Sequence, residues 1–463
     1  MANKVVGIQI GAISFVDEGV DRVLDIRQEK ARVNTLFIAT YTFDRGTGGR
    51  QIPGYPLPDH GIQEYDLNFR GGNFAEIHPQ YYVNTIIRDF RAPDHGDLDI
   101  LAEVLQEAKK RNIAIYCWIN ENPYNPIPKY VPNFPKVLEI DCYGKRTPLP
   151  CFNNPDYRNF HLSLVEDYCK SYDISGILWG SERQGPLGNL IGGGWNSNYV
   201  ACFCEHCRKL AYERGINIER AIKGYQTLSE FFLKAKENIR PRDGYFVTFW
   251  RILLDYPEIL AWEKLSVDSL MSLQKEIYGI VKAINPEIKI GWHIMHLLSF
   301  SPLYRAEQDY AELKDFSDFI KIALYNNCAG GRFIRFLQSL HKSILHDAEP
   351  EDSLRLIYKI LGIEEAPLDK LSIAGFSAEY IRRETERAVK GVNGRCSIWP
   401  GIDIDIPTGE NEKKTSPEDV KTAIKAAFAG GADGIILSRK YSEMRLTNLE
   451  AVGEVLGELG LNR

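Results

Sequence analysis

The chain has 463 residues, of which 44% are hydrophobic and 25% charged, so it can bury a large core and is neither disordered nor fibrous. Its 56 Lys and Arg against 62 Asp and Glu give a formal net charge of −6. Without a basic block, this balance argues against nucleic-acid binding. No apolar run approaches a membrane span, and no secretory signal precedes the early charges Asp17 and Glu18, so we expect a cytoplasmic protein.

Eight short runs of β-branched and aromatic residues alternate with longer amphipathic stretches. This pattern is typical of parallel strands joined by helices, and eight strands are what a closed barrel needs. We therefore predict an α/β fold, a (β/α)8 TIM barrel, with residues 1–463 as a single domain. The runs are Val5–Ile10, Thr35–Tyr41, Ile113–Ile119, Ile174–Trp179, Ile288–His293, Phe319–Tyr325, Ser397–Ile402 and Gly434–Ser438.

Three segments are too long to be plain connectors. Phe43–His95 and Asn120–Pro155 follow strand ends, so we expect long βα loops on the face of the barrel where active sites form. The segment 215–283 has helical periodicity broken at Pro241 and Pro257. We expect it to form a helical layer beside the barrel, and it is a candidate interface for a homo-oligomer.

A cysteine cluster with C-x-C-x2-C spacing predicts a metal site, because such short loops let three thiolates meet on one ion. Its members are Cys202, Cys204 and Cys207. Zinc takes four ligands, and His206 lies between two closely spaced ones, so a cysteine of the preceding loop, Cys151 or Cys142, is the expected fourth. Four thiolates leave no open position, which makes the expected Zn²⁺ structural.

The leading catalytic candidate is Glu182, which follows the buried run of strand four through a glycine and a serine. Beside Trp179, in a partly dry cleft, its pKa is expected to rise toward neutrality, which suits a general acid/base. Strand seven delivers Asp403 and Asp405 to the same face, and Asp403 lies nearer the strand end. Glycoside hydrolysis uses two such carboxyl groups.

Polar and aromatic residues at other strand ends describe a cleft suited to a hydroxyl-rich ligand, with rings stacking on sugars and polar groups bonding hydroxyls. The candidates for substrate binding are Tyr41, Asn120, Glu121, Trp179, His293, His296, Lys321, Tyr325, Trp399 and Arg439.

Two alternatives use the same face of the barrel. His293 and His296 could bind a catalytic metal, and Lys321 could form a Schiff base, so a lyase or isomerase acting on sugar acids remains open. A barrel that binds sugars without turnover is the other alternative.

The order of CFNNPDYR at Cys151–Arg158, Glu182 and CFCEHC at Cys202–Cys207 resembles the zinc-containing β-galactosidases. The resemblance implies a structural zinc with Cys151 as its fourth ligand, Glu182 as the acid/base, and a glycoside hydrolase acting on a small oligosaccharide or glycoside. The whole chain also resembles uncharacterised glycosidase-like barrels that end in GADGIILSRKYSEM. It departs from the β-galactosidases at Ser181, where they have Asn, and on strand seven, where they have a nucleophilic Glu.

Overall fold

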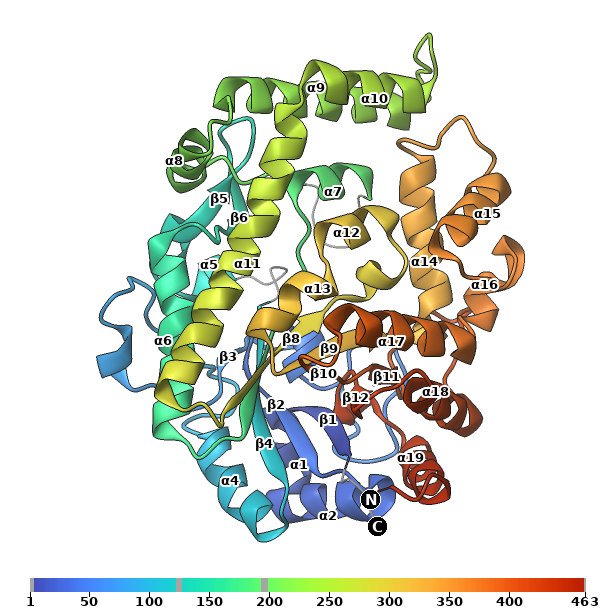
Figure 1. Ribbon diagram of the computed structural model, residues 1–463. Coiled ribbons are helices and arrows are strands. Elements are labelled where there is room, and N and C mark those ends of the chain that lie inside the picture. The colour runs from blue at the N-terminus through green and yellow to red at the C-terminus, as the bar shows by residue number, and fades with distance from the viewer. Residues whose placement is uncertain (1–3, 122–126, 193–198, 462–463) are drawn as a thin grey trace.

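The computed structural model describes residues 4–121, 127–192 and 199–461, so part of the second long loop lies outside the described residues. Its centre is a closed barrel of eight parallel strand positions, as predicted (Figure 1). β1 pairs with both β12 and β2, and this double pairing closes the sheet. The strands are β1 (Val5–Gly11), β2 (Thr35–Thr42), β4 (Ala114–Glu121), β7 (Gly176–Ser181), β8 (Lys289–Ile294), β9 (Phe319–Leu324), β10 (Ser397–Ile398) with β11 (Gly401–Asp403), and β12 (Gly434–Ser438).

The seventh position is split into β10 and β11 by Trp399 and Pro400, because proline has no N–H for the ladder. Outside the barrel, β3 (Gly72–Asn73) pairs antiparallel with the end of β2, and β5 (Leu138–Ile140) forms a hairpin with β6 (Arg146–Pro150). Both additions belong to the long loops that follow β2 and β4.

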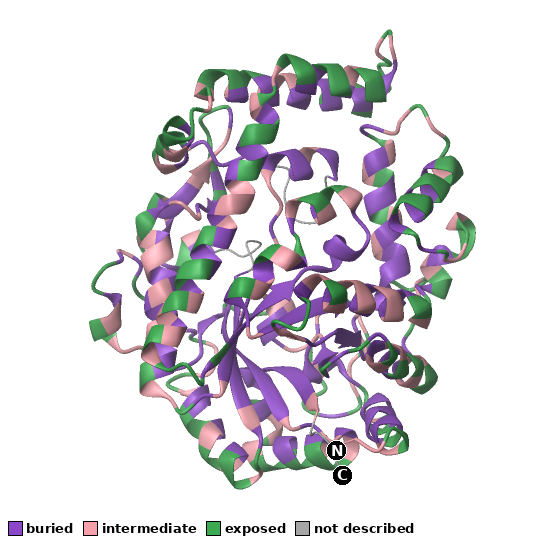
Figure 2. Cartoon of the chain, viewed as in Figure 1, coloured by how far each residue is buried: buried purple, intermediate pink, exposed green. Residues whose placement is uncertain are grey.

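Helices surround the barrel, and their inner faces and the strands are buried (Figure 2). Local signals fix several ends: α18 begins with a capping box between Ser416 and Asp419, with Pro417 in its first turn. The helices are α1 (Ala12–Glu18), α2 (Val20–Ala31), α3 (Arg45–Gly48), α4 (Ile100–Lys110), α5 (Ile127–Tyr130), α6 (Pro155–Ser171), α7 (Pro186–Ile191), α8 (Glu205–Glu213), α9 (Ile218–Lys236), α10 (Tyr245–Asp255), α11 (Glu258–Ile284), α12 (Pro302–Glu307), α13 (Tyr310–Leu313), α14 (Asn326–His341), α15 (Pro350–Leu361), α16 (Leu368–Ala374), α17 (Ala378–Val392), α18 (Pro417–Ala429) and α19 (Leu446–Glu458).

Side chains alternate between the barrel interior and the helices, as they must along a strand. Phe37 of β2 contacts Phe319 of β9, although these strands are not neighbours, so this aromatic cluster fills the interior. On β7, Leu178 belongs to the interior cluster and Trp179 to the outer core. The same alternation turns residue 182 toward the mouth of the barrel.

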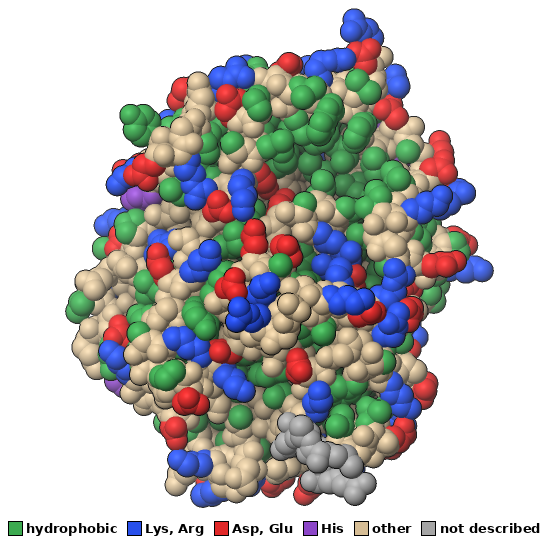
Figure 3. Space-filling model, viewed as in Figure 1, with side chains coloured by type: hydrophobic (Ala, Val, Ile, Leu, Met, Phe, Trp, Pro, Cys, Tyr) green, Lys and Arg blue, Asp and Glu red, His purple; other side chains and the backbone are tan. Residues whose placement is uncertain are grey.

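The segment 215–283 contains α9, α10 and most of α11, and Figure 1 shows α9 and α10 away from the barrel. α10 leaves Phe246, Trp250 and Leu254 about half exposed or more. Figure 3 shows hydrophobic side chains gathered between these helices and α14. A role in oligomer formation stays a prediction. None of the described helices combines the length and apolarity that crossing a membrane requires.

Candidate active site at the carboxyl end of the barrel

The structure brings three predicted residues together in a hydrogen-bonded chain. Nε2 of His293 lies 2.9 Å from Oε1 of Glu182, and Nζ of Lys321 lies 3.2 Å from Nδ1 of the same imidazole. Glu182 directly follows β7, and the other two residues belong to β8 and β9, so the three come from consecutive positions of the barrel. The side chain of Glu182 is 30% exposed and that of His293 only 7%, so the carboxylate is the open end of the chain.

Lys321 is fully buried and donates to three acceptors. Besides His293, its ammonium group bonds Oε1 of Gln9 at 2.8 Å and the hydroxyl of Tyr325 at 2.7 Å. Ser438 donates to the same oxygen of Gln9 at 2.8 Å. An ammonium group has three N–H donors, and here each has a partner. Because Lys321 donates to Nδ1 of His293, the neutral imidazole donates from Nε2 to Glu182.

The charges around Glu182 correct one expectation. Burial alone acts to raise the pKa of its carboxyl group, but the hydrogen bond from His293 and the charges of Arg332 and Lys321 outweigh it, and the pKa is lowered. Burial and Lys321 also lower the pKa of His293. Glu182 is therefore held as a carboxylate, against the raised pKa expected from the sequence, which suits a nucleophile or the base half of the expected acid/base role.

Burial lowers the pKa of Lys321 to about 7, as a Schiff-base lysine would need. Its Nζ, however, has no exposed surface and all its N–H groups are engaged. His296 bonds the hydroxyl of Tyr380 at 3.2 Å and Arg332 at 3.2 Å, whereas His293 bonds Glu182. Among the described residues, neither histidine belongs to a group that could hold a metal ion.

The two strand-seven aspartates have other partners. Asp403 is fully buried and accepts hydrogen bonds from the backbone N–H groups of Cys328 at 3.2 Å and Ile406 at 2.9 Å. Asp405 pairs with Arg445 at 2.8 Å and accepts from Asn448 at 2.9 Å. These bonds give both aspartates a structural role, and their part in a reaction stays a prediction.

Tyr41, Asn120 and Glu121 line one small pocket, but each is buried. The carboxylate of Glu121 pairs with Arg183 at 2.7 Å and accepts from Ser181 at 2.6 Å. This ion pair fixes the loop that follows Glu182, so Glu121 positions that loop.

Of the other candidates, the two tryptophans are packed away from open surface, whereas Arg439 is partly exposed. Trp179 is fully buried and donates to His161 at 3.3 Å, and Trp399 stacks on Phe319 at 4.1 Å inside the barrel. Arg439 forms an ion pair with Glu443.

The cysteine cluster forms as expected, with Cys151 rather than Cys142 as its fourth member. The four sulfurs lie within 4.8 Å of one another, and Cys151 is 3.5 Å from Cys207 and 3.6 Å from Cys204. A tetrahedral site with Zn–S bonds of about 2.3 Å places sulfurs about 3.8 Å apart. The four thiols therefore fit a closed zinc site. His206 bonds Asn154 at 3.4 Å instead.

Sequence reasoning missed Gln9, which links Lys321 to Ser438. The signal was available: Gln9 is the single polar side chain in the run Val5–Gly11, and a polar residue inside a buried strand needs a partner.

No family model and no curated protein matches the chain. Among solved structures, a β-galactosidase from Halorubrum lacusprofundi aligns with a TM-score of 0.56 and 13% identity, over 98% of this chain and 58% of that one. α-L-Fucosidase isoenzyme 2 from Paenibacillus thiaminolyticus aligns with a TM-score of 0.51 and 11% identity, over 99% of this chain and 49% of that one. The PgaB (BpsB) glycoside hydrolase domain from Bordetella bronchiseptica aligns with a TM-score of 0.51 and 10% identity, over 99% of this chain and 98% of that one.

The chain thus spans about half to three fifths of the fucosidase and the β-galactosidase, and nearly all of the PgaB domain. At these identities the likeness concerns the fold alone. The protein has the (β/α)8-barrel fold of these glycoside hydrolases.

Proposed function

We propose that the protein is a glycoside hydrolase that cleaves a small oligosaccharide or glycoside, with Glu182 as the reacting carboxylate. The observation that carries the proposal is the chain Glu182–His293–Lys321, whose open end is a partly exposed carboxylate. The likeness to glycoside hydrolase barrels supports it at the level of the fold.

Cleavage of a glycosidic bond builds positive charge at the anomeric carbon. An ionised Glu182 stabilises that charge and either attacks the carbon or takes a proton from the attacking water. His293 holds the carboxylate in place by its Nε2–H, and the ammonium group of Lys321 fixes the tautomer of the imidazole. The proton for the leaving oxygen must come from a second carboxyl group, and Asp403, whose pKa burial raises to about 6, is the candidate.

A sugar-binding barrel without turnover is the second candidate. The observation that favours it is the engagement of Asp403 and Asp405 in hydrogen bonds away from Glu182. Binding of a sugar without cleavage, unchanged in Asp403→Asn, would support this candidate.

The test is a panel of aryl glycosides in both anomers, with good and poor leaving groups, assayed with the protein and with Glu182→Gln. We expect the variant to lose a factor of about 100 to 10,000 in turnover on both kinds of leaving group. Glu213→Gln is the matched control, because Glu213 is an exposed residue of α8.

A loss confined to poor leaving groups would identify Glu182 as the general acid and refute its role as a carboxylate. Azide added to Glu182→Ala separates the two remaining roles: a restored rate with a glycosyl azide product indicates a nucleophile, and no rescue indicates a general base.

We also propose that Cys151, Cys202, Cys204 and Cys207 bind a structural Zn²⁺. When bound, the ion would join the loop after β6 to the start of α8. It supplies no open coordination position and therefore takes no part in the reaction.

A further inference from the structure

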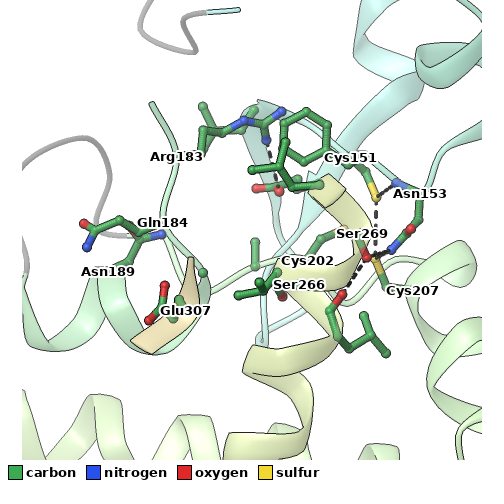
Figure 4. A pocket seen from close by; sticks show the side chains of 18 of the residues that line it. Cys151, Asn153, Arg183, Gln184, Asn189, Cys202, Cys207, Ser266, Ser269 and Glu307 are labelled. Carbon is green, nitrogen blue, oxygen red and sulfur yellow. Dashed lines mark hydrogen bonds and ion pairs between the residues drawn. The ribbon is translucent and has the colours of Figure 1, made fainter. Parts of the chain in front are cut away.

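A second pocket lies outside the barrel interior, next to the loop that follows Glu182. Its volume is about 80 Å³, space for roughly six water-sized groups. Figure 4 shows Glu307 and Gln184 on one side of it and Cys151 and Cys207 on the opposite side. The pocket is therefore bounded by the cysteine cluster, by α11 and by the end of α12.

A buried pair of carboxyl groups forms the acidic side. Glu263 of α11 accepts from the backbone N–H groups of Leu187 at 2.7 Å and Gly188 at 3.2 Å, at the start of α7. Glu307 lines the pocket and hydrogen-bonds to Glu263, so the pair shares a proton. The backbone packs directly on this pair: a Cβ at Gly185 would lie 2.2 Å from Oε1 of Glu263.

Three oxygens of the pocket residues lack a donor among the described parts of the chain. They are Oε2 of Glu307, Oε1 of Gln184 and Oε1 of Gln308, all of them buried atoms. Gln308 as a whole is only 8% exposed. A buried acceptor without a donor is unfavourable, so three in one pocket indicate a ligand that donates hydrogen bonds.

We propose that this pocket binds a ligand through a primary ammonium group, with Glu307 as the counter-ion. A primary ammonium has three N–H donors and no acceptor, which matches the three unpartnered oxygens. The remaining walls include Phe152, Leu270 and Met271, which suit the carbon atoms of such a ligand. A hydrated metal ion gains nothing from apolar walls and takes more oxygen ligands than this pocket offers.

The protonation of this carboxyl pair makes the affinity for the ligand depend on pH. Burial and the neighbouring Glu263 raise the pKa of Glu307 to about 9, and burial raises that of Glu263 to about 7. At pH 7.5 the pair therefore holds about one proton. An ammonium group favours the carboxylate, so binding must release that proton and must become tighter as the pH rises from 7 to 9.

The pocket adjoins the candidate active site. Gln184 follows Glu182 by two positions, and Tyr304 lines the pocket. Besides burial, the charges of both Glu307 and Glu182 raise the pKa of Tyr304, so this ring lies near both carboxylates. The proposal nevertheless stands whether or not Glu182 cleaves a glycosidic bond, because its test measures binding alone.

The test uses n-butylamine, which has five heavy atoms, against 1-butanol as its neutral analogue. Titration calorimetry at pH 7.5 in phosphate and in HEPES, whose ionisation enthalpies differ, measures affinity and proton release together. We expect butylammonium to bind with release of about one proton and 1-butanol not to bind. Glu307→Gln should weaken the amine about tenfold or more, and exposed Glu312→Gln should not.

Ethanolamine and ethylene glycol, with four heavy atoms each, form a second pair of a size that the pocket can hold. Binding of ethanolamine but not of ethylene glycol assigns the pocket to a hydroxylated amine, and binding of butylammonium alone assigns it to an amine with an apolar chain. The proposal is overturned if neither amine binds, if the neutral analogue binds equally well, or if Glu307→Gln leaves the affinity unchanged.

Discussion

Replacing Lys321 by methionine should change how the stability of the protein depends on pH. The pKa of Lys321 falls from 10.5 to about 7 on folding because the side chain is fully buried. That shift corresponds to about 5 kcal/mol between its charged and neutral forms. Between pH 7 and 10.5 the unfolded chain binds the proton and the folded chain does not, so this group makes the folded state more stable as the pH rises.

The free energy of unfolding changes by about 1.4 kcal/mol per pH unit for each proton that only the unfolded chain binds. Between pH 6.5 and 9.5 the free energy of unfolding of the wild type should therefore rise by about 3 kcal/mol relative to that of Lys321→Met. Glu182 and His293 have lowered pKa values and titrate below this window. Other groups titrate in both proteins and cancel in the difference.

The assay is urea unfolding followed by tryptophan fluorescence at both pH values, for the wild type and the variant. Lys289→Met, at an exposed position at the start of β8, is the matched control and should show the wild-type slope. An equal free-energy difference between wild type and Lys321→Met at pH 6.5 and 9.5 would refute the lowered pKa of the buried Lys321.

Three further outcomes test the cysteine cluster, the ion pair and the outer core. Cys151→Ser should reduce bound zinc, measured by mass spectrometry of the metal, to well below one ion per chain, whereas His206→Ala should retain it. Arg183→Met leaves Glu121 buried without its cation and should cost about 3–5 kcal/mol in urea unfolding, more than Arg183→Met combined with Glu121→Gln. Trp179→Phe should lower the free energy of unfolding by about 1–2 kcal/mol through the lost hydrogen bond to His161 but leave the KM unchanged. A changed KM would indicate that Trp179 contacts the substrate.

The sequence was sufficient to predict the barrel because strands and helices have different periodicities, and each of the eight runs is short, apolar and followed by a helical stretch. The cysteine cluster was predictable for the same local reason, since three of its members lie within six residues. From the spacing alone the fourth was open between Cys142 and Cys151; the resemblance to the zinc-containing β-galactosidases implied Cys151, and Cys151, at the end of the β5–β6 hairpin, is the one that joins the cluster.

The direction of the side chains at the strand ends was harder to predict from the sequence. Strict alternation already places Trp179 and Glu182 on opposite faces of β7, so the stacking role given to Trp179 was not consistent with the register. Asp403 and Asp405 are an alternating pair too, but β11 ends at Asp403, and beyond it the chain turns Asp405 toward Arg445. Pairings between distant residues, such as Glu263 with Glu307, leave no trace in the local pattern.

The polar layer above the aromatic core is the strongest argument that this barrel has a function at its mouth. The aromatic cluster around Phe319 and Trp399 shows that aromatic and aliphatic side chains, none of them charged, can fill the interior of this barrel. One layer higher, the chain instead buries Lys321, His293 and Gln9, at a cost in desolvation that the hydrogen bonds only partly offset. Stability alone would favour apolar residues there. This cost is explained if these polar residues serve to hold Glu182 ionised and oriented at the exposed end of the hydrogen-bonded chain Glu182–His293–Lys321.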